Sequence, residues 1–266
     1  MQAPDAALDG YERSSFDALG RSRPVLRTGS GPAVIVMSEV PGITPLVADF
    51  GRKVAARGLS VTMPQLFGTP GRPPSGRAIA RTMGQVCISR EFTLLATGRP
   101  SPITRWLRAL AAAEHERCGG PGVGAVGMCL TGGFALAMMI DDVVVAPVLS
   151  QPSLPLPLSA ARRRDLGLGD AELAVVRARA QAGTCVLGLR FSGDRGSPAE
   201  RFERLRQELG EGFVAVELDS SPGNPFGHPT SAHSVLTEHL QDRVGTPTRA
   251  ALDQVLDFLD ERLHAA

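Results

Sequence analysis

The chain has 266 residues, of which 43% are hydrophobic and 21% charged, and its formal net charge is +1. A nearly neutral chain lacks the electrostatic footprint of a nucleic-acid-binding or membrane-surface protein. No apolar run is long enough to span a bilayer. We therefore expect a globular protein with enough material for one sizeable core, and neither nucleic acid nor membrane as a partner.

The N-terminal residues and the cysteines indicate the compartment. Met1–Gly10 is polar and acidic and lacks the apolar segment of a signal peptide. The cysteines have neither the density of a disulfide framework nor the paired spacing of a zinc site. We therefore expect a reducing, cytoplasmic location and no metal or cofactor. The cysteines are Cys87, Cys118, Cys129 and Cys185.

Short apolar runs alternate with helical segments from about residue 30 onward. Continuously apolar runs are typical of strands covered on both faces of a parallel sheet. The predicted strands are part of Arg23–Thr28, then Ala33–Met37, Leu59–Met63, Gly122–Gly127, Val143–Val148, Cys185–Phe191 and Phe213–Leu218.

Helix signals lie between these strands. A hydroxyl residue followed by proline opens a helix, and glycine marks its end. Alternating strands and helices favour a doubly wound, mostly parallel α/β sheet. The predicted helices run from Thr44-Pro45 to Gly58, from Ser101-Pro102 to Gly119, from Ser197-Pro198 to Gly210, and from Thr246-Pro247 to about Leu263.

No long polar linker divides the sequence, so we expect residues 1–266 to form one domain, with residues 1–22 as an N-terminal extension. Residues 68–100 and 149–180 break the alternation of strands and helices. Both segments leave the carboxyl ends of strands, where open α/β sheets bind their ligands. We expect them to rim a pocket; the alternative is two surface excursions without function.

The most informative motif is Gly127-Met128-Cys129-Leu130-Thr131-Gly132-Gly133, which follows the apolar run Val123-Gly124-Ala125-Val126. A strand that stops at small residues, shows one reactive side chain and resumes as a helix is typical of a nucleophile elbow. The turn strains its central residue, and small neighbours let the two backbones pass closely. We predict that Cys129 is a nucleophile; the alternative is a buried small hydrophobe.

A cysteine nucleophile needs a base, and the base needs an acidic residue to orient it. In α/β-hydrolases the nucleophile, the acid and the histidine follow in that chain order. Asp194, just past a predicted strand, is the favoured acid and Asp219 its rival. His233 is the favoured base because of its spacing to the final helix; His228 competes with it, and His239 is the least favoured of the three.

Four segments together resemble the dienelactone hydrolase family. The run around Cys129 is similar to the family's Gly-x-Cys-Leu-Gly-Gly elbow, and Glu39-Val40-Pro41-Gly42 is similar to its Glu-Ile-Phe-Gly segment. Gly193-Asp194 matches the acidic position, and His233-Ser234-Val235 resembles the family's His-Ser-Phe. The four segments occur in the family's order, which makes the resemblance far more specific than the elbow alone.

The resemblance implies an α/β-hydrolase fold and a triad of Cys129, His233 and Asp194 acting on a small ester or lactone. The thiolate attacks the carbonyl to give a thioacyl-enzyme, and the histidine then protonates the leaving group and activates water. The backbone N–H groups of Leu130 and Val40 form the implied oxyanion hole.

The resemblance also implies that Glu39 approaches the resting thiol and shares a proton with it. The chain departs from the family at Thr131, where glycine is usual. The family's substrate-binding arginines have no aligned counterpart. Arg90 and Arg81 are candidates for binding a substrate carboxylate; surface positions are the alternative.

We therefore expect a cysteine-dependent hydrolase of a small-molecule ester or lactone, as a monomer or small homo-oligomer. One alternative is a non-hydrolytic relative that binds a small molecule or a protein partner. Another is a redox-responsive thiol protein, which is disfavoured because no resolving cysteine is evident near Cys129.

Overall fold

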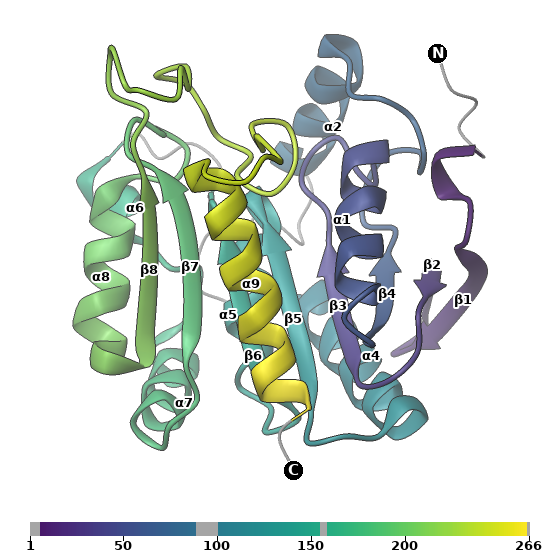
Figure 1. Ribbon diagram of the computed structural model, residues 1–266. Helices are drawn as coiled ribbons and strands as arrows, with labels where there is room; N and C mark the ends of the chain where they lie inside the picture. The colour runs from purple at the N-terminus through teal and green to yellow at the C-terminus, as the bar shows by residue number, and fades with distance from the viewer. Residues whose placement is uncertain (1–5, 89–100, 155–158, 265–266) are drawn as a thin grey trace.

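The computed structural model describes residues 6–88, 101–154 and 159–264. Within these residues, one sheet of eight strands runs through the molecule with helices on both of its faces (Figure 1). The strand order is β1-β2-β4-β3-β5-β6-β7-β8. The strands are β1 (Glu12–Ala18), β2 (Arg21–Thr28), β3 (Ala33–Met37), β4 (Ser60–Pro64), β5 (Val123–Met128), β6 (Val144–Ser150), β7 (Val186–Phe191) and β8 (Phe213–Leu218).

Neighbouring strands from β4 to β8 run parallel, whereas β1 and β2 add antiparallel pairs at one edge. The predicted mostly parallel α/β sheet is confirmed. All the strands predicted from apolar runs are present; β3 and β8 have the predicted bounds, and the ends of the others lie within two residues of them.

Strand β3 shows why the central strands are continuously apolar. Ala33, Ile35 and Met37 belong to one buried apolar cluster, whereas Val34 and Val36 belong to another. Successive side chains of a strand point to opposite faces. Both faces of this sheet are covered, so both sets of side chains have to be apolar.

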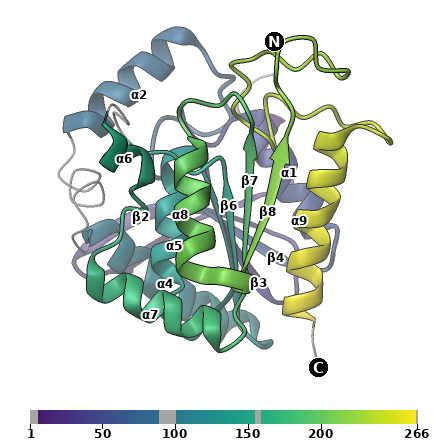
Figure 2. The same ribbon diagram turned by 90° about the vertical axis from the view of Figure 1, so that its left-hand side faces the viewer.

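Helices form a layer on each face of the sheet (Figure 2). The apolar cluster on one face includes residues of α1 and α9, and the cluster on the other face includes residues of α4, α5, α7 and α8. The helices are α1 (Pro45–Ala55), α2 (Gly76–Ile88), α4 (Pro102–Cys118), α5 (Gly132–Met138), α6 (Ala160–Arg164), α7 (Asp170–Gln181), α8 (Ala199–Leu209) and α9 (Pro247–Leu263).

Three of the four predicted helix starts are confirmed. Helices α1, α4 and α9 have proline in the first turn and a hydroxyl side chain that accepts a backbone N–H. The start of α8 differs, because Pro198 rather than Ser197 is its N-cap. The carbonyl of Ser197 accepts a hydrogen bond from Arg190, which connects this residue to strand β7. The three hydroxyl caps are Thr44, Ser101 and Thr246.

The N-terminal segment differs from the expected extension. Strand β1 and the first residues of β2 lie within residues 1–22 and pair with each other at the edge of the sheet. From Arg13 to the end of β1, exposed and half-buried positions alternate. An edge strand of this kind carries no apolar run, which is why the sequence pattern did not predict it.

The two segments expected to rim a pocket contain helices. Residues 68–100 include α2; residues 89–100 lie outside the described part of the chain. Residues 149–180 include α6 and α7. Leu173 and Val176 of α7 are buried in the core, so this helix covers the sheet.

Candidate active site

Cys129 follows the central strand β5 and has a φ of +55°. It opens a short 3-10 turn, Cys129–Thr131, which continues directly into α5. A positive φ is strained for a residue with a Cβ atom, and such strain is common at functional sites. The strand–turn–helix geometry agrees with the nucleophile elbow expected from the sequence, and the side chain is half-buried.

Close approaches around the elbow explain its small residues. A Cβ atom on Gly127 would lie 2.3 Å from the carbonyl oxygen of Thr131, and one on Gly132 would lie 2.7 Å from the Cβ of Pro152. Both distances are shorter than normal van der Waals contact. The glycines therefore let the strand, the turn and the loop after β6 pack together.

The Thr131 side chain has a defined place in this turn. Its buried hydroxyl accepts the N–H of Met128 at 2.8 Å and lies 2.9 Å from the carbonyl oxygen of Met37. Met37 is the last residue of β3. The threonine that replaces the family's usual glycine therefore connects the elbow to the neighbouring strand.

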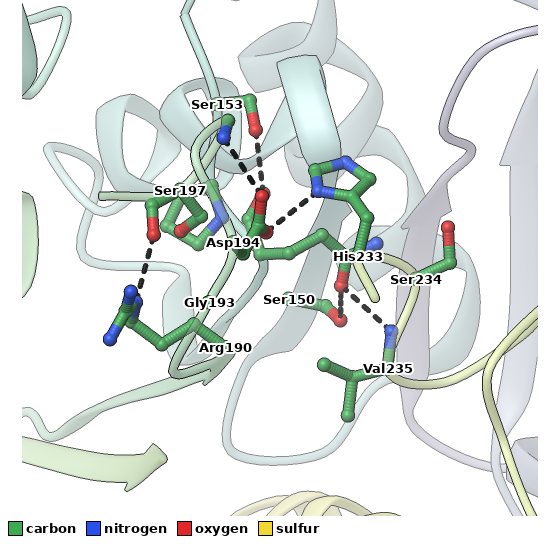
Figure 3. Close-up of polar contacts among 12 residues, drawn as sticks. Ser150, Ser153, Arg190, Gly193, Asp194, Ser197, His233, Ser234 and Val235 are labelled. Atoms are coloured by element: carbon green, nitrogen blue, oxygen red, sulfur yellow. Dashed lines mark hydrogen bonds and ion pairs between the residues drawn. The ribbon is translucent and has the colours of Figure 1, made fainter. Parts of the chain in front are cut away.

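His233 and Asp194 point toward one another at the carboxyl edge of the sheet (Figure 3). His233 Nδ1 lies 2.7 Å from Asp194 Oδ2, and Oδ1 of the same carboxylate accepts the N–H of Gly196 at 2.8 Å. Asp194 lies after β7, and His233 lies on the long loop after β8. The predicted acid and the predicted base are thus in direct contact.

The three side chains are coupled electrostatically. Burial lowers the pKa of His233, but the interactions with Cys129 and Asp194 outweigh burial and raise this pKa to about 11. Burial raises the pKa of Asp194, but the hydrogen bond and charge of His233 bring it below its usual value. The arrangement therefore favours an imidazolium ion held between the carboxylate and the sulfur.

The predicted oxyanion-hole amides come from the ends of adjacent strands. Met37 of β3 and Gly127 of β5 are register partners, and Val40 and Leu130 each lie three residues further along. Leu130 is in the first turn of a helical segment, where N–H groups have no partner within the helix. This register brings both amides to the same edge of the sheet as Cys129.

The sequence model of the dienelactone hydrolase family matches residues 22–261 of the chain. The chain belongs to this family. The match includes the elbow, Glu39, Asp194 and His233, so the resemblance recognised in four short segments extends over most of the chain. A comparison with curated proteins gave no match.

Solved structures share the fold of this family member at low sequence identity. A dienelactone hydrolase-like promiscuous phosphotriesterase from metagenomic libraries has a TM-score of 0.61 and 15% identity, covering 95% of this chain and 98% of that chain. 2,6-Dihydroxy-pseudo-oxynicotine hydrolase has a TM-score of 0.57 and 15% identity, covering 94% of this chain and 68% of that chain. A cold-adapted esterase from an Arctic intertidal metagenomic library has a TM-score of 0.56 and 14% identity, covering 95% of this chain and 93% of that chain. These likenesses support the α/β-hydrolase fold.

Glu39 is buried beside the histidine loop. Its carboxylate accepts hydrogen bonds from Ser234 Oγ at 2.6 Å and Gln151 Nε2 at 3.0 Å, and a third from Thr237 Oγ1. Among the described residues, no hydrogen bond joins Glu39 to Cys129. The structure therefore connects this glutamate to the base through Ser234, the residue after His233.

Gln151 is a site residue that sequence reasoning missed. It follows β6, is fully buried and has a φ of +38°. Its side chain binds Glu39 through Nε2 and accepts the N–H of Val235 through Oε1 at 3.3 Å. No motif in the sequence marks this residue, because its role depends on contacts with two distant loops.

The rival acid and bases lie elsewhere. Asp219 is exposed and accepts the N–H of Ser221. His228 is buried, and burial lowers its pKa. His239 supports the favoured base, because its Nδ1 accepts the backbone N–H of His233 at 3.3 Å. Of the three candidate bases, only His233 forms a hydrogen bond with the favoured acid, Asp194.

Arginines line a cavity of about 410 Å³ that lies against the segment after Val40. Arg81 of α2 lines it together with Arg72 and Arg77, which the sequence analysis did not single out. Pro41, the residue after Val40, also lines the cavity, and none of the described residues that line it has an acidic side chain. Arg90 lies outside the described residues.

In the described part of the chain, no helix combines the length and apolar character needed to cross a membrane. Within the same residues, no group of three or more His, Cys, Asp or Glu side chains is placed to hold a metal ion.

Proposed function

We propose that the protein is a cysteine-dependent hydrolase of a small ester or lactone. The observation that carries this proposal is the strained Cys129 at the end of β5, coupled to a histidine whose other nitrogen lies 2.7 Å from Asp194. Membership of the dienelactone hydrolase family supports the same reaction class.

In the proposed reaction, the sulfur of Cys129 attacks the substrate carbonyl while the amides of Leu130 and Val40 bind the oxyanion. Collapse of the tetrahedral intermediate breaks the ester bond. His233 gives its proton to the leaving oxygen, and a thioacyl-enzyme forms. His233 then takes a proton from water, which attacks the thioester and releases the acid. Asp194 holds the imidazole in the orientation that both steps need.

The arginine-lined cavity supports a substrate that bears an anionic group, such as a carboxylate. Guanidinium groups bind carboxylates through paired hydrogen bonds. Arg81, Arg72 and Arg77 line a space beside Pro41, and none of the other described residues that line it is acidic. We propose that the substrate's anionic group enters this cavity while its carbonyl reaches Cys129.

The test is hydrolysis of a panel of aryl esters and enol-lactones by the wild-type protein, C129A and H233A. We expect turnover by the wild type and its loss in both variants, together with an acyl adduct on Cys129 in rapidly quenched samples analysed by mass spectrometry. Turnover retained by C129A would overturn the assigned nucleophile. Tight binding without turnover by the wild type would favour the non-hydrolytic relative.

A further inference from the structure

Arg201 in the first turn of α8 is a buried arginine that the proposed mechanism does not use. Its exposed fraction is 2%. The guanidinium donates to four carbonyl oxygens, those of Asp165 at 2.7 Å, Pro152 at 2.8 Å, Arg162 at 3.1 Å and Gly196 at 3.2 Å. Among the described residues, no carboxylate forms an ion pair with it. Burial of an arginine without a counterion costs free energy. This cost suggests that Arg201 has a role beyond packing.

One nitrogen of Arg201 supports the loop that holds the nucleophile. Nη1 donates to the carbonyl oxygen of Pro152, and the N–H of the next residue, Ser153, donates to the carbonyl oxygen of Cys129 at 2.9 Å. A single peptide unit therefore separates the guanidinium from the group that fixes the strained backbone of Cys129.

The same nitrogen supports the loop that carries the acid. Nη1 also donates to the carbonyl oxygen of Gly196, whose own N–H donates to Oδ1 of Asp194. Asp194 Oδ2 is the atom that contacts His233. Arg201 thus binds both the peptide that holds Cys129 and the peptide that holds Asp194. Cys129 follows β5 and Asp194 follows β7, the two strands on either side of β6 in the sheet.

The charge of Arg201 acts on the same two groups. Burial lowers the pKa of Arg201 to about 10, and interactions with Asp165, then Asp194, Cys129 and Glu200, oppose this decrease. The guanidinium therefore stays protonated at neutral pH. Coulombic attraction is mutual, so the buried charge favours both neighbouring groups when they are ionised.

We propose that Arg201 is a positioning residue: it fixes the Cys129 and Asp194 loops relative to each other and supplies a buried positive charge beside them. This inference rests on the proposed cysteine-dependent hydrolysis. Arg190 supports the Asp194 loop in a different way, because its guanidinium is paired with Glu217 at 2.6 Å. Among the described residues Arg201 has no such ion pair, and its guanidinium donates to the carbonyl oxygens of Pro152 and Gly196 in the two loops.

The test compares R201Q, which removes the charge, with R201K, which keeps the charge but loses the planar fork. R163Q is the matched control, because Arg163 also connects α6 with α8, through a pair with Glu200 at 2.8 Å whose side chains are 41% and 36% exposed. Three quantities are measured for each protein: kcat and KM for an active aryl ester, the rate of Cys129 alkylation by iodoacetamide as a function of pH, and the urea unfolding midpoint.

For R201Q we expect kcat to fall about 10- to 100-fold with KM changed less than about threefold, because a misplaced triad lowers the rate more than it weakens binding. We also expect its alkylation profile to move to higher pH. R201K keeps the alkylation profile close to the wild type but has a reduced kcat. R163Q leaves all kinetic quantities within about twofold of the wild type, since exposed ion pairs contribute little.

A folded R201Q with wild-type kcat and a wild-type alkylation profile would overturn the proposal. If R201Q does not fold, R201K decides the question, and a folded R201K with wild-type kcat is then the contrary result. The alkylation arm needs no substrate. If the wild type hydrolyses no ester, the proposed function fails, whereas the role of Arg201 still stands or falls on the pH profile.

Discussion

His233 Nδ1 lies 2.7 Å from Asp194 Oδ2, although the two residues belong to loops after different strands. The other oxygen of the carboxylate accepts the N–H of Gly196, so the orientation of Asp194 does not depend on the histidine alone. In the proposed reaction this contact selects the tautomer that presents Nε2 to the sulfur.

We expect D194N to lower kcat about 10²- to 10⁴-fold, because the amide keeps the shape of the carboxylate but cannot stabilise the imidazolium ion. KM for the same ester should change little. The matched control is D219N, since Asp219 is an exposed aspartate at the end of the neighbouring strand β8. Comparable losses in D194N and D219N would contradict the assignment of the acid.

The pKa of His233 makes a prediction about alkaline stability. Its value of about 11 in the folded protein exceeds the ordinary 6.5, so the folded state holds this proton more tightly than the unfolded state. Above about pH 6.5 the unfolded chain loses this proton whereas the folded protein keeps it, so unfolding releases the proton. The free energy of unfolding therefore falls as the pH rises from about 6.5 toward 11.

Urea unfolding at pH 8.5 and at pH 10.5 measures this dependence. We expect the wild-type free energy of unfolding to decrease by at least about 1 kcal/mol over this interval. The decrease should be smaller in H233Q, which has no proton to release. An equal pH dependence in the two proteins would show that His233 does not hold the extra proton.

The hydroxyl of Thr131 gives a prediction about the elbow. T131V keeps the shape but leaves the N–H of Met128 and the carbonyl of Met37 without this partner. We expect a loss of about 1–3 kcal/mol in the free energy of unfolding and a reduced kcat. T131S, which keeps the hydroxyl, is the control and should retain most of both. Chemical denaturation and ester hydrolysis check the pair.

The sheet and the contact between acid and base could be predicted because they depend on local sequence patterns. Apolar runs mark strands buried on both faces, and the small residues around Cys129 mark a tight strand–helix turn. Parallel strands place their carboxyl ends at one edge, so Asp194 and His233 were expected to approach each other. Chain order and spacing favoured His233 over His228, and His233 is the histidine that contacts Asp194.

The supporting contacts could not be predicted, because they depend on packing between distant segments. Gln151 has no motif, yet its strained backbone directs an amide between Glu39 and Val235. Arg201 looks like one of many arginines in a charged helix, and only the fold buries it. Strand β1 was missed for a related reason, since an edge strand is stabilised by pairing and needs no apolar run.

The three hydrogen bonds of Glu39 predict a role in placing the histidine loop. E39Q removes one negative charge and replaces one carboxylate oxygen by an amide NH₂ group. This group is a donor and would face the hydroxyl of Ser234 or Thr237, which is also a donor in the wild type. We expect kcat to fall about tenfold or more, because His233 is adjacent to Ser234. S234A, which removes only one donor, should have a smaller effect. Unchanged thiol alkylation and turnover in E39Q would remove the support for any part of Glu39 in the reaction.

The arginine-lined cavity predicts that the effect of Arg81 depends on the charge of the substrate. Arg81, Arg72 and Arg77 line the same space, and a guanidinium gains binding energy only from an anionic group placed there. For an ester that bears a carboxylate, we expect R81Q to raise KM about 10-fold or more, by the loss of a charge-assisted hydrogen bond of roughly 1.5–3 kcal/mol. For the neutral ester of the same size, KM should stay within about twofold. Added salt should weaken binding of the anionic ester alone, because it screens this interaction. Equal effects of R81Q on both esters would indicate that Arg81 supports α2 and does not recognise the anionic group.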